Sequence, residues 1–180
     1  MKTITVPARE QVSDESQLLF DQIQKKMGKV PNLYATIGYS AHALKAMLEF
    51  DATLSNQSAF TAKEREAINL VVSQVNLCNY CLAAHTTLAQ LRGFTKDETL
   101  TIRKGHASDA KLDAVIQLAQ SIAENKGKAE AAVLEQFFAI GYNEAALIEL
   151  IGLITLRTFT NYVYSNTDIP IDFPIADELN

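Results

Sequence analysis

The apolar residues of the chain recur mostly at spacings of three and four positions, the period of one face of an α-helix. No stretch alternates convincingly between apolar and polar residues, as a half-buried strand would. Glycine and proline, which interrupt helices, occur only 7 and 4 times in 180 residues. The pattern predicts an all-α fold: one domain, residues 1–180, built as a bundle of about seven or eight helices.

Polar capping residues and glycines indicate where these helices begin and end. Gly28 is expected to end a first helix. Thr61 to Glu64 and Thr95 to Glu98 each fit a capping box, in which the side chains of the first and fourth residues bond each other's backbone N–H groups. The segment 165–180 contains two prolines, so we expect an irregular tail lying over the bundle or over a neighbour. Ser13 is expected to open that first helix, and Ser40 and Ser108 to open two further helices.

Composition and charge narrow the class of protein. The formal net charge is −5, which argues against a nucleic-acid partner. The most apolar segment, Ala145 to Leu156, is interrupted by Glu149 and is short for a membrane span, so it indicates a core helix and no membrane partner. The N-terminal residues contain no apolar signal segment. We therefore expect a cytoplasmic protein.

Three chemically reactive residues lie within eight positions, at Cys78, Cys81 and His85. In a reducing compartment, two such cysteines favour redox chemistry or metal binding over a structural disulfide. Spacings of three and four place all three side chains on one helix face. Both sulfurs fall in the first helical turn, where the helix dipole favours a thiolate. His85, one turn further on, is then within reach of Cys81 and able to take its proton.

A carboxylate joins this cluster if the chain folds back on itself. Residues 61–93 predict two helices, one from about residue 62 to 74 and one that starts near 77–79 and ends at Gly93. If the hairpin turns near Asn76, symmetric counting places Glu66 beside His85. A carboxylate there orients the imidazole ring and holds its proton. The order Glu66, His85, Cys81, Cys78 predicts a proton relay that ends in a dithiol.

This set of residues resembles the active-site motif of the alkylhydroperoxidase D-like branch of the carboxymuconolactone decarboxylase family, and in particular its peroxidase-related members. Glu66, the Cys-x-x-Cys pair and His85 stand at the family spacing. The likeness extends to the stretches GKVPNLYATIGYS and LRTFTNYVYSNTDIPIDFP, so it covers most of the chain. One position departs from the best-known member, where a second histidine precedes the second cysteine. Here that residue is Tyr80, which is expected either to donate a hydrogen bond through its hydroxyl or only to line the pocket.

The resemblance implies a peroxidase that works through its dithiol. A thiolate attacks a small hydroperoxide and becomes a sulfenic acid, the second cysteine condenses with it to a disulfide, and a dithiol reductant restores both thiols. In the family the reductant is typically a lipoyl-bearing protein, no cofactor or metal is required, and the proteins are trimers or hexamers. Position near the helix start favours Cys78 as the attacking sulfur, whereas the histidine and the resemblance favour Cys81. We assign Cys81 as peroxidatic and Cys78 as resolving.

Other functions remain open from the sequence. The same dithiol would serve a general dithiol–disulfide oxidoreductase, or a non-enzymatic protein that senses redox state or binds a partner. Two thiolates, an imidazole and a carboxylate also form a possible zinc ligand set, although helices favour a disulfide over structural zinc. The decarboxylases of the same family use no dithiol, so the intact cysteine pair argues against that activity. Asn161 is a polar residue in an apolar helix, and it faces either the pocket or a buried backbone group.

Overall fold

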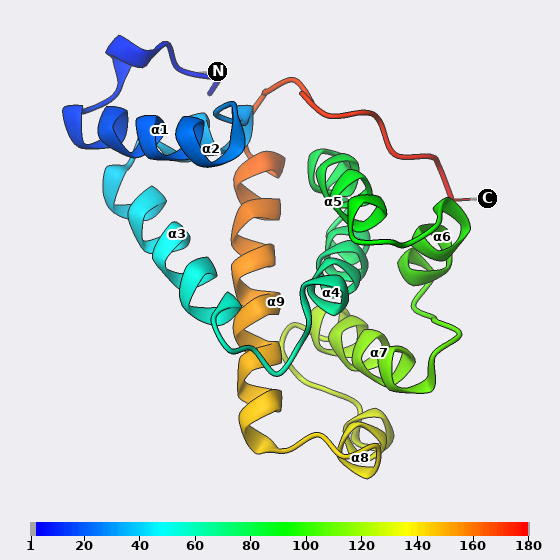
Figure 1. Ribbon diagram of the computed structural model, residues 1–180. Coiled ribbons are helices and arrows are strands. Elements are labelled where there is room, and N and C mark those ends of the chain that lie inside the picture. Colours follow the sequence, from blue (N-terminus) through cyan, green and yellow to red (C-terminus); the bar gives the residue numbers. More distant parts are fainter. Residues whose placement is uncertain (1–2, 180) are drawn as a thin grey trace.

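The computed structural model describes residues 3–179. This part of the chain contains nine α-helices and a short 3-10 helix (Figure 1). This part of the chain contains no strand, so the predicted all-α class is confirmed. The nine α-helices of the described residues exceed the predicted seven or eight. The elements are η1 Arg9–Gln11, α1 Asp14–Met27, α2 Asn32–Ile37, α3 Ala41–Ser55, α4 Ala62–Val75, α5 Asn79–Leu91, α6 Lys96–Arg103, α7 Ala110–Glu124, α8 Ala131–Ala139 and α9 Glu144–Ser165.

The predicted caps account for most helix boundaries. Both capping boxes are present: Thr61 and Thr95 each accept from the backbone N–H three residues on, and Glu64 and Glu98 each accept from the cap's own N–H. Gly28 ends α1 with a φ of 80°. Ser13 and Ser40 are N-caps as expected. The prediction for Ser108 was wrong: the cap of α7 is the next residue, Asp109, whose carboxylate accepts from the N–H of Leu112 at 2.8 Å. Both residues are good N-caps, and the backbone places Asp109 at the cap position.

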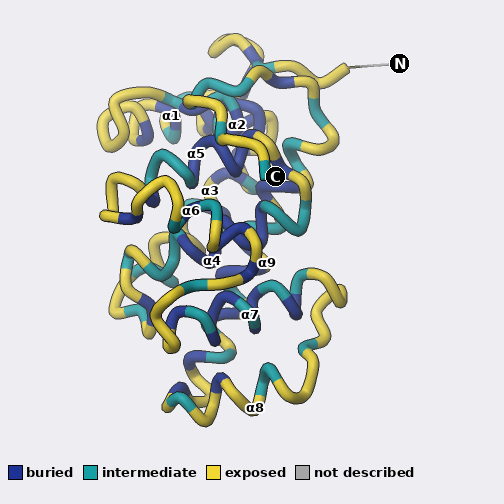
Figure 2. Tube along the Cα trace, turned by 90° about the vertical axis from the view of Figure 1, so that its right-hand side faces the viewer, coloured by how far each residue is buried: buried dark blue, intermediate teal, exposed yellow. Residues whose placement is uncertain are grey.

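Helix α4 lies at the centre of the larger core. It packs against α5, α6, α7 and α9, and its inward residues, such as Ile68 and Val71, are fully buried. Figure 2 shows the buried residues concentrated in α4, α7 and α9, while α8 at one end is mostly exposed. Removing this much apolar surface from water is the main source of stability for the bundle.

A second apolar cluster holds the cysteines. It is formed by residues of α1, α2 and α3, among them Phe20, Leu33 and Leu44, together with Cys78 and Cys81 at the start of α5. The next residue along α5, Leu82, already belongs to the larger core around α4. The first turn of α5 is therefore placed where the two clusters meet.

Helix α9 runs the length of the molecule, and the chain after it crosses the start of α5 (Figure 1). By length and composition α9 is apolar enough to cross a membrane, and it packs against α2, α3, α4, α5 and α7. This contact with five helices agrees with the predicted core helix. Residues 166–179, which we name the C-terminal strap, have no helix or strand, as expected for the tail. Residue 180 lies outside the described residues.

Candidate active site

The turn between α4 and α5 fixes the backbone of Cys78. Asn76 ends α4, and Leu77 follows with a φ of 53°, in the left-handed region that usually holds glycine. The N–H of Leu77 bonds the carbonyl of Gln74 at 3.1 Å, and the N–H of Cys78 bonds the carbonyl of Ser73 at 3.0 Å. This pair of bonds is a Schellman motif. Cys78 completes that motif and is at once the N-cap of α5.

Both cysteine thiols are free and almost completely buried, with exposed fractions of 0% for Cys78 and 1% for Cys81. Cys78 Sγ accepts a hydrogen bond from the backbone N–H of Cys81 at 3.3 Å. Each thiol also shifts the pKa of the other, as close neighbours do. Neighbouring sulfurs on one helical turn need only a small shift to reach the distance and angles of a disulfide.

Glu66 on α4 and His85 on α5 form a buried pair in which His85 Nδ1 lies 2.7 Å from Glu66 Oε2. The structure thus brings together the two side chains that counting along the hairpin placed side by side. Burial raises the pKa of Glu66, but the nearby His85 outweighs burial, and the pKa lies below its ordinary value. Burial and the positive charge of Arg157 lower the pKa of His85. A neutral imidazole beside an ionised carboxylate carries its proton on Nδ1, which leaves Nε2 able to accept one.

From the sequence, His85 is expected to lie within reach of Cys81. Among residues 3–179 no hydrogen bond joins the two side chains. The pKa of Cys81 is lowered by the Cys78 thiol first, and then by Arg157, Asn161 and Thr160 of α9. A transfer of its proton to His85 therefore needs a bridging group or a small rearrangement of the side chains.

The two thiols differ in acidity. The hydrogen bond from Cys78, the positive charge of Arg157 and the hydrogen bonds from Asn161 and Thr160 outweigh burial, and they lower the pKa of Cys81 to about 7. The pKa of Cys78 is raised far above its ordinary value, because Cys78 bonds to Cys81 and is buried beside it. Cys81 is therefore the sulfur that carries negative charge near neutral pH.

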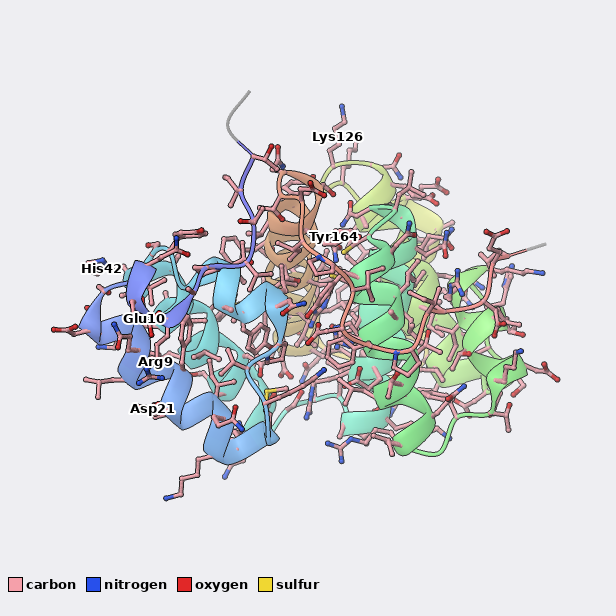
Figure 3. The ribbon with its side chains drawn as sticks, turned by 90° about the horizontal axis from the view of Figure 1, so that it is seen from above. Arg9, Glu10, Asp21, His42, Lys126 and Tyr164 are labelled. Carbon is pink, nitrogen blue, oxygen red and sulfur yellow. The ribbon has the colours of Figure 1, made fainter. Side chains whose placement is uncertain are left out.

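Tyr80, between the two cysteines, fastens the C-terminal strap over the site. Its hydroxyl donates to Asp172 Oδ1 and accepts from the backbone N–H of Leu33 at 3.2 Å. Its ring meets Phe173 edge-on at 5.7 Å and tilts against Tyr164 at 5.5 Å. Tyr164 lies between α9 and α5 in the view of Figure 3. Burial and the bond to Asp172 raise the pKa of Tyr80, so this residue is a neutral wall of the site.

Four contributors to the site lie far from the cysteines in the sequence. Asn161 was noticed only as a polar residue in an apolar helix, and Arg157, Thr160 and Asp172 were missed. A signal for the α9 residues exists: positions 157, 160 and 161 are three and four apart, so they form a polar stripe on an otherwise apolar helix. Asp172 has no such signal, because its role depends on how the strap lies.

The zinc alternative lacks a ligand set in the described part of the chain. Within residues 3–179 no three side chains of the types His, Cys, Asp and Glu converge as metal ligands would. Glu66 and His85 pair with each other, while the two sulfurs bond each other and α9. The four predicted site residues thus form two adjoining pairs.

The sequence and the fold around this site are similar to those of known proteins. Residues 41–124 match the sequence profile of the carboxymuconolactone decarboxylase family, and they include Glu66, both cysteines and His85. An uncharacterized peroxidase-related protein from Silicibacter sp. TM1040 is 25% identical and aligns with a TM-score of 0.78 over 92% of this chain and 91% of that chain. The chain is therefore similar to the carboxymuconolactone decarboxylase family over residues 41–124. In fold, the chain is similar to peroxidase-related proteins of the alkylhydroperoxidase D-like type.

Other solved structures show how varied this alkylhydroperoxidase D-like fold is. A peroxidase-related protein with an alkylhydroperoxidase AhpD core, from Ralstonia eutropha JMP134, is 18% identical, with a TM-score of 0.78 over 97% of this chain and 92% of that chain. A cysteine-to-alanine variant of the debrominase Bmp8, in complex with 2,3,4-tribromopyrrole, is 16% identical, with a TM-score of 0.79 over 96% and 92%. At such identities the likeness concerns the fold alone. A comparison with curated proteins finds no match.

Proposed function

We propose that the protein is a thiol-dependent peroxidase, which reduces hydroperoxides through a dithiol–disulfide cycle of Cys81 and Cys78. The observation that carries the proposal is the contact between two free, buried thiols of unequal acidity. The ionised sulfur of Cys81 supplies a nucleophile, and the protonated thiol of Cys78 supplies the resolving group at once. The peroxidase-related neighbours support this class of activity.

The cycle balances in three steps. The Cys81 thiolate attacks one oxygen of the hydroperoxide, the O–O bond breaks, and a sulfenic acid and an alcohol form once the alkoxide takes a proton. The Cys78 thiol then displaces water from the sulfenic acid and forms the disulfide. A dithiol reductant, of the lipoyl-bearing type that the family uses, exchanges with this disulfide and returns both thiols.

The Glu66–His85 pair manages protons in this scheme. His85 Nε2 has no hydrogen-bond partner within residues 3–179, and the ring is neutral, so it accepts the proton that leaves the thiols. Glu66 holds the ring through Nδ1 and stabilises the imidazolium that forms. Within residues 3–179 of the resting structure no hydrogen bond joins His85 to Cys81, so we expect the Glu66–His85 pair to act mainly on the leaving alkoxide. A homo-oligomeric, cytoplasmic enzyme is part of the same proposal.

The decisive experiment is the thiol titre and intact mass of the reduced protein before and after one equivalent of cumene hydroperoxide. We expect both thiols to disappear with a loss of about 2 Da, and dihydrolipoamide to restore them. The Cys81→Ser variant should keep its remaining thiol, while Cys78→Ser should gain about 16 Da as a sulfenic acid. Unchanged thiols in the wild type would refute the peroxidase. The same dithiol would then point to a general disulfide oxidoreductase, which oxidised glutathione or a disulfide peptide would reveal.

A further inference from the structure

A small cavity, which we name the strap cavity, lies beneath the C-terminal strap where the strap passes from α5 to α6 (Figure 1). Its volume is about 170 Å³, the space of about five or six water molecules at ~30 Å³ each. Its walls are apolar at Leu82 of α5 and at Ile171 and Ala176 of the strap, and polar at Asn79 and Arg103. Asn79 and Leu82 each directly follow a cysteine, so the cavity adjoins the turn that carries the dithiol.

The guanidinium group of Arg103 is almost completely buried in this wall, since the residue has an exposed fraction of only 6%. Its Nε donates to Gln74 Oε1 at 2.9 Å, and its Nη1 donates to the backbone carbonyl of Asp177 at 2.6 Å. Within residues 3–179, Nη2 has no hydrogen-bond partner and Arg103 forms no ion pair with a carboxylate. In that part of the chain the fully enclosed side-chain polar atom without a partner is Thr86 Oγ1, so Nη2 is not enclosed and its N–H groups face the free space of the cavity.

A buried positive charge without a counter-ion is unfavourable, and an anion that reaches it relieves this cost. The planar guanidinium group matches the geometry of a carboxylate, and two hydrogen bonds already hold that of Arg103 in place, so little freedom is lost on binding. Two carboxylates also border the cavity, those of Asp177 and Glu178. Asp177 pairs with Lys96 at 3.0 Å, and both acidic residues are exposed, so water screens their charges. The guanidinium group is therefore the dominant charge inside the cavity.

We propose that the strap cavity is a binding site for a short aliphatic carboxylate. Its oxygens accept hydrogen bonds from Nη2 of Arg103, and its chain lies against Leu82 and Ala176. The volume limits the ligand to about five or six non-hydrogen atoms, so propionate and butyrate match it best. Inorganic phosphate would satisfy the arginine but would leave the apolar walls facing a hydrated ion. The site uses neither thiol, so it does not depend on the proposed peroxidase activity.

The experiment is a titration of the reduced protein with butyrate, followed by saturation-transfer difference NMR, which detects weakly bound ligands. We expect saturable binding with a millimolar dissociation constant, as befits so small a ligand. Butyramide has the same size but no charge, and it should bind at least about tenfold more weakly. Equal binding of butyramide, or no saturable binding of butyrate up to about 50 mM, would overturn the proposal. Phosphate that displaces butyrate at equal concentration would also overturn it, because the apolar walls would then contribute nothing.

Variants locate the ligand in the cavity. Arg103→Gln should weaken butyrate binding by at least about tenfold, whereas Arg92→Gln, at the exposed C-cap of α5, should change it by less than about twofold. Ala176→Leu keeps the arginine but fills the cavity, so it should abolish binding, and it keeps the test open if Arg103→Gln does not fold. Unchanged binding in either folded variant would overturn the proposal. Because no peroxide is involved, butyrate binding together with unchanged thiols after peroxide treatment would reject the peroxidase while keeping the carboxylate site.

Discussion

The C-terminal strap should control access to the two buried thiols, and Asp172 is the residue that fastens it. Its carboxylate accepts from the hydroxyl of Tyr80, from Lys29 Nζ at 3.0 Å and from the backbone N–H of Asn32 at 3.4 Å. The replacement Asp172→Ala removes all three bonds without touching a cysteine. We expect the strap to leave the start of α5 more often, and the thiols to react faster with reagents in solution.

The size of the effect follows from the bonds lost. The bond from Tyr80 to an ionised carboxylate contributes about 1.5–3 kcal/mol. The ion pair with Lys29 adds about 0–1 kcal/mol, because the lysine side chain is 46% exposed and water screens the charge. Water replaces part of these bonds when the strap opens, so a net change of about 2 kcal/mol is reasonable. That shifts the opening equilibrium by about 30-fold.

The assay is the rate of thiol modification by iodoacetamide at pH 9, where Cys81 is ionised with or without the substitution. The matched control is Asp177→Ala, which removes an exposed ion pair to Lys96 at the other end of the strap and should change the rate by less than about twofold. Circular dichroism checks that both variants remain folded. Equal rates in Asp172→Ala and wild type would refute the reasoning, because reagents would then reach the sulfurs by a route that the strap does not cover.

Three further predictions concern stability. The pKa of His85 is lowered in the fold, so the unfolded chain takes up the proton first and the urea midpoint should fall as pH drops below about 6.5. The lowered pKa of Glu66 adds a further loss of stability below about pH 4.5, which Glu66→Gln should abolish. A urea midpoint that stays constant from about pH 8 to 4 would contradict both expectations. Leu77→Gly should raise the free energy of unfolding by about 0.5–1 kcal/mol, because Leu77 is 74% exposed at a positive φ; a lower urea midpoint would argue against this. Gly38→Ala should lower the free energy of unfolding by about 1–3 kcal/mol, because the added Cβ would lie 2.5 Å from the ring of Phe20. An unchanged melting temperature would show that the ring moves freely.

Much of the hairpin could be predicted because its determinants are local. Capping boxes, a glycine after a helix and the 3.6-residue period all act over a few positions. Counting back from the turn at Asn76 sufficed to place Glu66 against His85, because two helices joined by a short turn have few ways to pack. The cap of α7 was misplaced by one residue, since Ser108 and Asp109 are both good N-caps and only the backbone decides between them.

The rest of the site depends on contacts between distant segments. Their positions relative to the hairpin cannot be found by counting residues from a turn. The strap reaches Tyr80 from 92 residues away, and Asn161 reaches Asn76 from 85 residues away. No turn of defined length fixes either approach. A polar stripe on an apolar helix indicates that Arg157, Thr160 and Asn161 face something polar, but it does not say that two sulfurs lie there.

The order of acidity of the two thiols shows why this matters for mechanism. Local geometry favours Cys78, because as N-cap of α5 it receives the backbone N–H of Cys81 at 3.3 Å. The surroundings reverse that preference: the Cys78 thiol, Arg157 and Asn161 all favour negative charge on Cys81. One neutral hydrogen bond is weaker than the Cys78 thiol and the nearby positive charge of Arg157 acting together. The nucleophile of this hairpin is therefore set by Cys78 first and by α9 second, so removing the charge of Arg157 should raise the pKa of Cys81 and slow its alkylation near neutral pH without altering either cysteine.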